Sequence, residues 1–450
     1  MIRLRVWAND QALGWFGHEA GQYFFQYDPS WLASPHAYVL APQFALRPEP
    51  HVGEPVKTFF ANLLPEGAAL EEILSAMHMR DASTFEIVGQ LGQELPGVLS
   101  VRAEGNAPSG QQQYSVLSPE VLSQRIQDRE LQKPLLTSND QSSMSLPGAQ
   151  DKLGLRYDAR RGRLYDSVGS TPTTHIAKPD TRLLRFQPSA VNEYLCMRLA
   201  AAIKLPVPAV HLLQVPETVY IVQRYDRVMV DGRVQCLHQV DGCQLLGLGQ
   251  DWKYERQGLV SLQRIAAALR GLPLPAKDLL SFQRWVMFNY LIGNSDAHAK
   301  NISVLIDETG YALAPFYDLL CVQVYGDERL ALYIGDDDRY ASIGAHSWEA
   351  LCQDCGFRLP ETLKGFRKLA QDLIIEGYRP AQMIADLRKY QAELEIQNKA
   401  LRYSQQEAEG ASERFATLFS SVPLALMVVD EEGLVLASNA MALRLFQPTE

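Results

Sequence analysis

Hydrophobic and polar residues alternate in short runs through the first part of the chain. The runs from Arg3 to Trp7 and from Gln22 to Tyr27 have the two-residue period of half-buried strands, and Val56 to Leu64 has helical spacing. Between Ala103 and about Ser145 the residues are mainly Gln, Ser, Pro and Asn, with one helical stretch near Pro119 to Arg129. These patterns predict a small β-rich subdomain over residues 1–102, followed by a linker or mobile loop over residues 103–145.

The next segment, residues 146–240, predicts a small sheet with one helix. Strand-like runs cover Lys152 to Tyr157, Thr174 to Lys178 and Val219 to Arg224, and the apolar residues from Ala190 to Ile203 recur at helical spacing. We expect this segment to complete one lobe of the protein.

From residue 241 to residue 386 the pattern is mostly helical. The helix expected at Phe282 to Ile292 has one apolar face. It is followed by two short strands, Ile302 to Ile306 and Tyr311 to Ala314, with a turn between them, which predicts a hairpin directly behind a helix.

The last part of the chain changes character again. Leu387, Leu394 and Leu401 are spaced by seven residues among Glu, Gln and Lys, which predicts a weak coiled-coil linker over residues 387–413. Residues 414–450 alternate helix and strand signals and resemble the opening of a PAS sensor domain. That segment is too short to close a PAS core, because domains of this kind need about 100 residues.

Composition narrows the class of protein. The chain has 450 residues, of which 47% are hydrophobic and 21% charged, so two or three folded domains are expected. Its net charge of -10 argues against a protein that mainly covers a phosphate backbone. We found no signal-peptide pattern and no apolar run of membrane-spanning length, which predicts a cytoplasmic protein without a membrane partner.

The six cysteines fit a reducing compartment, where disulfides are rare. Cys352 and Cys355 form a lone C-x-x-C without a second ligand pair, so we interpret them as structural residues and expect no zinc site.

The segment Gly293 to Asn301, GNSDAHAKN, carries the most chemical information. Phosphoryl transfer needs a carboxylate that orients the attacking hydroxyl and an amide oxygen that holds magnesium, both on one rigid loop. Asp296 and Asn301 are five positions apart, which is the interval of the protein-kinase catalytic loop. The second carboxylate, Asp318, follows the expected hairpin at the place of the metal-binding aspartate of kinases.

Two further stretches suit nucleotide phosphates. The turn Leu146, Pro147, Gly148, Ala149 and Gln150 allows backbone N–H groups to approach phosphate oxygens, and Lys152 follows it, although the Walker A pattern is absent. Lys178 ends an apolar strand, as the strand lysine of kinases does. Glu193 on the next helix is a candidate partner for Lys178, with a solvated surface charge as the alternative.

The runs SLPGAQDKL, THIAKPD, YIVQRYDR, HQVDGCQLLG, NSDAHAKN and FYDL, in this order, resemble the HipA family of toxin kinases. GQYFFQYDPSWL and FFANLLPEG resemble the small first subdomain of the same family, so the resemblance covers about residues 1–385. It implies an α+β, bilobal protein-kinase-like fold with a β-rich N-terminal subdomain and a mostly helical C-terminal lobe.

The resemblance also implies chemistry and partners. Asp296 would be the catalytic base, Asn301 and Asp318 the Mg2+ ligands, Lys178 and His298 phosphate contacts, Gln223 and Tyr225 the adenine hinge, Asp226 and Gln239 the ribose contacts, and Ser145 the autophosphorylated serine. ATP and Mg2+ would be the cofactors. A HipB-like DNA-binding antitoxin would be the partner, with DNA bound only through it, and an aminoacyl-tRNA synthetase is the type of protein target. Gln223 departs from the glutamate common at its position in the family.

Three functions remain open at this point. The leading hypothesis is a serine/threonine protein kinase toxin of a toxin–antitoxin system, of the kind linked to persistence. A lipid or small-molecule kinase is the second, because phosphoinositide kinases use a similar Asp-x-His-x-x-Asn order. The third is a catalytically silent module that binds an antitoxin, which the joint presence of Asp296, Asn301, Asp318 and Lys178 disfavours.

Overall fold

The computed structural model describes residues 3–108, 110–128, 152–376, 417–421, 424–429 and 435–446. The chain divides into two units, Met1–Arg388 and Lys389–Glu450. In the part of the chain that the structure describes, no helix combines the length and the apolar character needed to cross a membrane.

The N-terminal subdomain is an antiparallel sheet in the order β4-β3-β2-β1-β5, packed against short helices. Its strands are β1 (Arg3–Ala8), β2 (Gln11–Glu19), β3 (Gln22–Tyr27), β4 (His51–Val52) and β5 (Leu99–Ala103), and its helices are α1 (Pro29–Leu32), α2 (Glu54–Ala61), α3 (Gly67–Ala76) and α4 (Thr84–Leu91). Every second residue of β1 and β3 is buried, as the alternating pattern predicts. The expected strands at Arg3 to Trp7 and Gln22 to Tyr27 are therefore confirmed.

Aromatic side chains fill the core of this subdomain. Phe16 of β2 stacks on Phe60 of α2, with ring centroids 4.0 Å apart. Helix α2 ends at Ala61, and the chain continues to the expected Leu64 as a tighter turn, in which the N–H groups of Leu63 and Leu64 donate to the carbonyls of Phe60 and Ala61. The Asn62 side chain donates to the carbonyls of Thr58 and Leu248. Asn62 thereby ties the end of the helix to a segment far along the chain.

The second sheet has six antiparallel strands in the order β10-β11-β9-β7-β8-β6. They are β6 (Gln113–Leu117), β7 (Leu153–Asp158), β8 (Arg163–Val168), β9 (His175–Pro179), β10 (Val210–Gln214) and β11 (Thr218–Gln223), and two helices, α5 (Pro119–Asp128) and α6 (Ser189–Ala202), accompany them. Val219 and Ile221 of β11 share a core with α5, whereas Tyr220 and Val222 join the core that contains α6. Because neighbouring strand residues point to opposite faces, the two helices cover opposite faces of this sheet.

This sheet corrects the expected linker over residues 103–145. Strand β6 pairs with β8, and Leu122 and Ile126 of α5 are buried against β7 and β11, so residues 113–128 belong to the folded lobe. The polar composition misled the prediction because β6 lies at an edge of the sheet with most of its side chains toward solvent. Residues 129–145 of the expected linker lie outside the described residues.

A hairpin and a three-stranded sheet connect this lobe to the helical lobe. The hairpin pairs β12 (Arg227–Val230) with β13 (Arg233–Cys236), and the sheet has the order β14-β15-β16, with β14 (His238–Asp241), β15 (Ser303–Asp307) and β16 (Gly310–Leu313). The strands expected near Ile302 and Tyr311 are confirmed as an antiparallel pair. The expected boundary between residues 240 and 241 falls inside β14, which pairs with β15.

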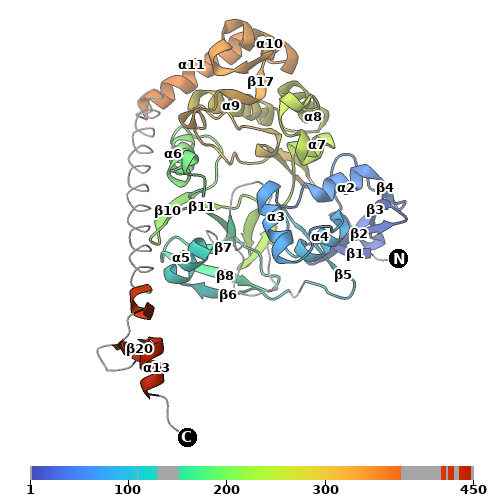
Figure 1. The fold of residues 1–450 in the computed structure, drawn as a ribbon. Coiled ribbons are helices and arrows are strands. Elements are labelled where there is room, and N and C mark those ends of the chain that lie inside the picture. The colour runs from blue at the N-terminus through green and yellow to red at the C-terminus, as the bar shows by residue number, and fades with distance from the viewer. Residues whose placement is uncertain are drawn as a thin grey trace. The chain divides into compact units, whose positions relative to one another are not determined.

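The helical lobe follows β14. It contains α7 (Gly242–Leu246), α8 (Leu262–Gly271), α9 (Ala276–Ile292), α10 (Ala345–Cys355), α11 (Leu359–Ile375), the strand pair β17 (Arg329–Ile334) and β18 (Asp337–Arg339), and the 3-10 turns η3 (Gln250–Trp252), η4 (Glu255–Gln257), η5 (Ala299–Asn301), η6 (Gln323–Tyr325) and η7 (Tyr340–Ser342); η2 (Leu184–Phe186) precedes α6. Figure 1 shows α8 to α11 gathered at one end of the first unit and β6 to β8 at the other. Cys352 and Cys355 are free thiols and both are buried, in keeping with a structural role.

The second unit is described in three short pieces. Strands β19 (Met427–Val429) and β20 (Val435–Ser438) pair antiparallel, and α13 (Ala440–Phe446) follows them. The two expected strands and the helix that follows them are present in this order, whereas the PAS assignment stays a prediction. The expected coiled coil over residues 387–413 lies outside the described residues.

Candidate active site

The predicted catalytic loop joins α9 to β15. Helix α9 ends at Gly293, which has a φ of 75° in the left-handed region, where a Cβ atom would approach Gln323 Oε1 to 2.9 Å. The loop is then held by its own side chains: the Asp296 N–H donates to Asn294 Oδ1 at 3.2 Å, and Asn301 Nδ2 donates to the Asp296 carbonyl at 3.3 Å. These bonds fix the backbone on both sides of Asp296, so the carboxylate has a defined direction.

The Asp296 carboxylate has a partner that the sequence did not indicate. Tyr254 Oη donates to Asp296 Oδ1 at 3.0 Å, and the Tyr254 ring contacts the His298 ring edge to face at 5.4 Å. Burial, together with the neighbouring Asp296 charge, raises the pKa of Tyr254 above its ordinary value, so the phenol remains a donor. Tyr254 is distant from Asp296 in sequence and belongs to no recognised motif, so only the fold brings the two together.

Lys178 lies between two carboxylates, one on the buried Glu193 and one on the partly exposed Asp318. Its Nζ is 2.9 and 3.0 Å from the two carboxylate oxygens of Glu193 and 2.7 Å from Asp318 Oδ1. Glu193 is only 3% exposed, which excludes the alternative of a solvated surface charge. The Lys–Glu pair and the contact with Asp318 are what a kinase needs to place the nucleotide phosphates and the metal.

Electrostatics distinguish the two carboxylates of this cluster. Burial raises the pKa of Glu193 to about 7 despite the nearby Lys178 ammonium. Burial opposes ionisation of Asp318 as well, but there the Lys178 ammonium outweighs it and holds the pKa of Asp318 well below its usual range. Asp318 also has a φ of 58°, an uncommon backbone conformation for a residue other than glycine. Such residues concentrate at functional sites, where the surrounding structure holds them in place.

A second buried lysine, Lys300, joins the catalytic loop to the N-terminal subdomain. Its Nζ lies 2.9 Å from Asp241 Oδ2 and 3.5 Å from Glu66 Oε1, and it donates to the Asn62 carbonyl at 3.0 Å. Lys253 Nζ contacts the other oxygen of Glu66 at 2.6 Å. Burial lowers the pKa of Lys300, but Asp241 and Glu66 outweigh that effect and raise it. These residues were not predicted as site residues, although Lys300 and Asp241 lie inside the quoted runs.

One cavity of about 370 Å³ collects the predicted residues. Its lining includes the expected base, metal ligands and nucleotide contacts, which are Asp296, Asn301, Asp318, Lys152, Lys178, Gln223, Tyr225, Asp226, Gln239 and His298. Asn62, Glu66, Lys253, Tyr254 and Lys300 line the same cavity, so the N-terminal subdomain contributes to its wall. The predicted phosphate turn, residues 146–150, and Ser145 lie outside the described residues.

The expected hinge residues lie where β11 ends. The Tyr225 ring stacks on Tyr317 with centroids 5.3 Å apart, and its hydroxyl donates to the Gln239 side chain. The backbone N–H of Gln223 donates to the Ala209 carbonyl at 2.9 Å, so that donor already serves the sheet. The hinge therefore offers an aromatic pair and the Gln239 amide to a ligand, and the adenine contact stays a prediction.

Asp226, the expected ribose contact, is held by protein groups. Its carboxylate lies 2.8 Å from Arg224 Nη2 and 2.8 Å from Arg227 Nη1, and accepts from the Gly97 N–H at 2.8 Å. Although burial opposes ionisation, the two guanidinium groups hold the pKa of Asp226 well below its usual range. The ribose role stays a prediction, and the observed contacts give Asp226 a structural role at the cavity wall.

The cavity suits a nucleotide with a hard cation. Asp318 and Asn301 supply oxygen ligands of the kind that Mg2+ prefers, and phosphate oxygens normally complete its coordination. Among the described residues no cluster of three or more His, Cys, Asp or Glu side chains could hold a metal by itself.

His298 is 8% exposed, and its buried Nδ1 lacks a hydrogen-bond partner in the described structure. Burial and the Lys178 charge lower the pKa of Lys152 to about 8, which leaves it mostly protonated at neutral pH.

Comparison with known proteins agrees with this geometry. The family model of the HipA-like C-terminal domain matches residues 144–377, and that of the HipA N-terminal domain matches residues 4–102. The chain is 33% identical to the candidate kinase Y4mE of Sinorhizobium fredii over 79% of this chain and 86% of that protein. It is 28% identical to the serine/threonine-protein kinase toxin HipA of Shewanella oneidensis over 68% of this chain and 72% of that protein.

A solved structure shares the fold. The complex of Shewanella oneidensis HipA, HipB and operator DNA matches with a TM-score of 0.71 and 24% identity, covering 86% of this chain and 95% of that chain. The two lobes are those of the protein-kinase-like fold. The chain belongs to the HipA family and is a HipA-type kinase. The expected α+β bilobal fold is thereby confirmed.

Proposed function

We propose that this protein is a serine/threonine protein kinase toxin that transfers the γ-phosphate of MgATP to a hydroxyl of a protein target. The observation that carries the proposal is the Lys178–Glu193–Asp318 cluster in the same cavity as Asp296, whose backbone is fixed by Asn294 and Asn301. Phosphoryl transfer is catalysed mainly by such positioning and by charge stabilisation.

Each residue of the cavity has a role in this proposal. Asp296 accepts the proton of the attacking hydroxyl, and Tyr254 holds its carboxylate in place. Asn301 and Asp318 would hold Mg2+, which would neutralise charge on the phosphates. Lys152, Lys178 and His298 contact the phosphates, together with backbone groups of residues 146–150. Gln223 and Tyr225 receive adenine, and Gln239 and Asp226 lie near the ribose.

We propose a HipB-like DNA-binding antitoxin as the partner, so that DNA is bound only through it. Support comes from the structural neighbour, which is a complex of HipA, HipB and operator DNA. A translation component such as an aminoacyl-tRNA synthetase is the proposed target, on the family resemblance alone.

A labelling experiment tests the kinase. The full chain and an Asp296→Asn variant would be incubated in a lysate with ATP labelled at the γ-phosphate, and the labelled species identified. We expect a labelled protein with the unchanged chain and none with the variant, while Asp251→Asn, at an exposed residue of η3, serves as the control. A labelled lipid or metabolite would instead identify a lipid or small-molecule kinase.

A growth assay distinguishes a kinase toxin from a catalytically silent binding module. Expression of the full chain should arrest growth, and well-expressed Asp296→Asn should not. Full arrest by the variant would contradict the kinase toxin and favour a module that acts by binding alone.

We also propose that Ser145 is an off-switch, because it lies three residues before Gly148 in the predicted phosphate turn. A phosphate there adds a charge of about -1.5 to -2 and repels the ATP phosphates. Incubation with MgATP should add one phosphate to Ser145 and weaken ATP binding, and Ser145→Ala should stay unmodified. Mass spectrometry identifies the phosphorylated residue, and nucleotide titration measures ATP affinity. Equal ATP affinity of the Ser145-phosphorylated and the unmodified protein would contradict the switch.

A further inference from the structure

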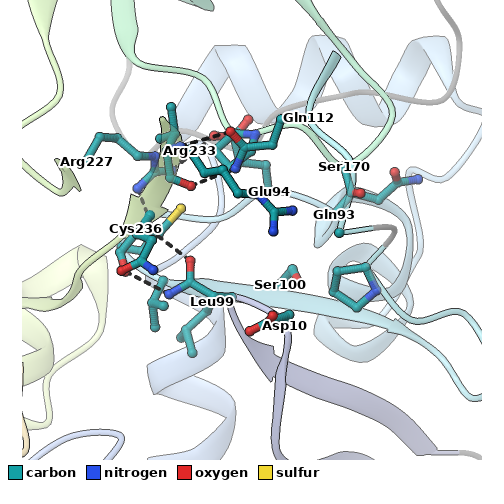
Figure 2. Close-up of a pocket in the computed structure, with 18 of the residues that line it drawn as sticks. Asp10, Gln93, Glu94, Leu99, Ser100, Gln112, Ser170, Arg227, Arg233 and Cys236 are labelled. Atoms are coloured by element: carbon teal, nitrogen blue, oxygen red, sulfur yellow. Dashed lines mark hydrogen bonds and ion pairs between the residues drawn. The ribbon is translucent and has the colours of Figure 1, made fainter. Parts of the chain in front are cut away.

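A second cavity, of about 400 Å³, lies between the N-terminal sheet and the β12–β13 hairpin. Figure 2 shows Arg233 and Gln112 on one side of it and Asp10 and Ser100 on the other. Reciprocal hydrogen bonds hold its walls together: Asn9 bonds through its amide to the Cys236 backbone at 3.0 and 2.9 Å, and Gln112 bonds likewise to the Val234 backbone. The cavity is therefore a built feature of the contact between the two subdomains.

A buried arginine lines this cavity. Arg102, on β5, is 7% exposed, yet among the described residues it makes no ion pair with any carboxylate. Its side chain donates one hydrogen bond, from Nη2 to the Gln93 carbonyl at 3.2 Å, and its buried Nε has no hydrogen-bond partner in the described part of the chain. Burial lowers the pKa of Arg102, and no opposing charge offsets that effect. A buried guanidinium without a counter-ion is costly and therefore uncommon.

The other buried charges around this cavity balance one another. Glu94 Oε1 lies 3.0 Å from Arg227 Nη2 and 3.3 Å from Arg224 Nη1, and Asp226 pairs with the same two arginines. That group of four is neutral as a whole, so it supplies no counter-charge to Arg102. The remaining carboxylates of the lining, Asp10 and Asp231, are exposed and screened by water.

Arg233 adds a second guanidinium at the rim. It is exposed, it forms no ion pair among the described residues, and its Nη2 lies beside Gly110, where an added Cβ would be 3.8 Å away. Ser100 adds a polar residue to the same lining. The lining thus holds the arginines Arg102, Arg227 and Arg233 and the carboxylates Asp10, Glu94 and Asp231. Glu94 pairs with Arg227, and Asp10 and Asp231 are exposed, so the buried cation without an ion-pair partner among the described residues is Arg102. A buried guanidinium of this kind is suited to an oxyanion.

We propose that this cavity binds a small oxyanion, a phosphate or a carboxylate, with Arg102 as its buried anchor and Arg233 closing it from the rim. This site is separate from the kinase cavity, which contains neither arginine. Its size suits a small metabolite.

Calorimetric titration of the full chain with inorganic phosphate, and separately with citrate, tests the site. Arg102→Met removes the charge and keeps an unbranched stem, and we expect it to weaken binding about tenfold or more, as loss of a charged hydrogen bond does. Arg233→Gln, at the rim, should weaken binding by a few fold. Arg163→Met, the same substitution at an exposed residue of β8, is the matched control and should bind like the unchanged chain.

Thermal unfolding in buffer without phosphate or citrate adds a second measurement. Because an unpaired buried charge is replaced by an apolar side chain, Arg102→Met should melt at or above the temperature of the unchanged chain. Weaker anion binding with undiminished stability is the result expected of a ligand site, whereas a structural arginine would lose stability.

The two ligands identify the oxyanion. Binding of phosphate that depends on Arg102 assigns the site to phosphate compounds, and binding of citrate that depends on Arg102 assigns it to carboxylates. The proposal is overturned if neither binds at about 10 mM, or if Arg102→Met binds both as tightly as the unchanged chain.

Discussion

Lys178 and Lys300 line the same cavity, and both are buried, but their partners differ. Lys300 is enclosed by Asp241 and Glu66, whose side chains are 11% and 7% exposed, and it also binds the Asn62 carbonyl of another subdomain. Lys178 has one enclosed partner, Glu193, and one accessible partner, Asp318, whose side chain is 33% exposed. Asp318 is therefore accessible to a ligand beside Lys178. Lys300 instead contacts two enclosed carboxylates and the Asn62 carbonyl, and so holds the catalytic loop against the N-terminal subdomain.

The largest expected effect is on the rate of phosphoryl transfer, and it comes from Asp318, the accessible partner of Lys178. Asp318→Asn should reduce phosphoryl transfer at least about 100-fold, because the charge that meets the phosphates and the metal is removed. Unfolding should change little, since Glu193 remains to pair with Lys178. Labelling kinetics and a urea melt measure the two effects, with Asp251→Asn as the control. Retained activity would place the metal elsewhere.

The variant Lys300→Met tests whether Lys300 holds the catalytic loop against the N-terminal subdomain. We expect a loss of about 3 kcal/mol in the free energy of unfolding, because Asp241 and Glu66 stay buried with less neutralising charge. Urea unfolding measures this, and Lys277→Met, at an exposed residue of α9, should change stability by less than about 0.5 kcal/mol. If the two variants proved equally stable, the comparison between the lysines would fail.

Glu255, next to Tyr254, gives a pH prediction. Burial raises its pKa from 4.5 to about 7, so between these values the folded chain binds more protons at Glu255 than the unfolded chain does. Its contribution to stability is thus greatest at low pH and decreases as pH rises from about 4.5 to about 7. Unfolding of Glu255→Gln at several pH values should show the variant gaining stability relative to the unchanged chain over that window. Glu71→Gln, at an exposed residue of α3, is the matched control.

The smallest effect is expected from the second unit. Because the chain divides at Arg388 and Lys389, removal of residues 389–450 should leave ATP affinity and the melting temperature of the first unit unchanged. Nucleotide titration of the shortened chain checks this. A shortened chain that unfolds or no longer binds ATP would make the second unit part of the kinase fold.

The local sequence determined much of the secondary structure and the residue order of the catalytic loop. The alternation in β1 and β3, the long helix α9 and the order of the loop from Gly293 to Asn301 follow from period, capping and motif, which are properties of neighbouring residues. The pairing of β6 with β8 was missed, because an edge strand carries few apolar residues.

Only the tertiary structure decided which distant charges meet. The sequence left two roles open for Glu193, a partner of Lys178 or a solvated surface charge, and the distance of 2.9 Å between the two side chains decided for the first. Nothing in the sequence around Glu66, Tyr254 or Arg102 indicates which side chains they contact. The reason is physical: burial of a charge, and hence its cost and its use, depends on which segments pack around it, and no period or spacing along the chain encodes that.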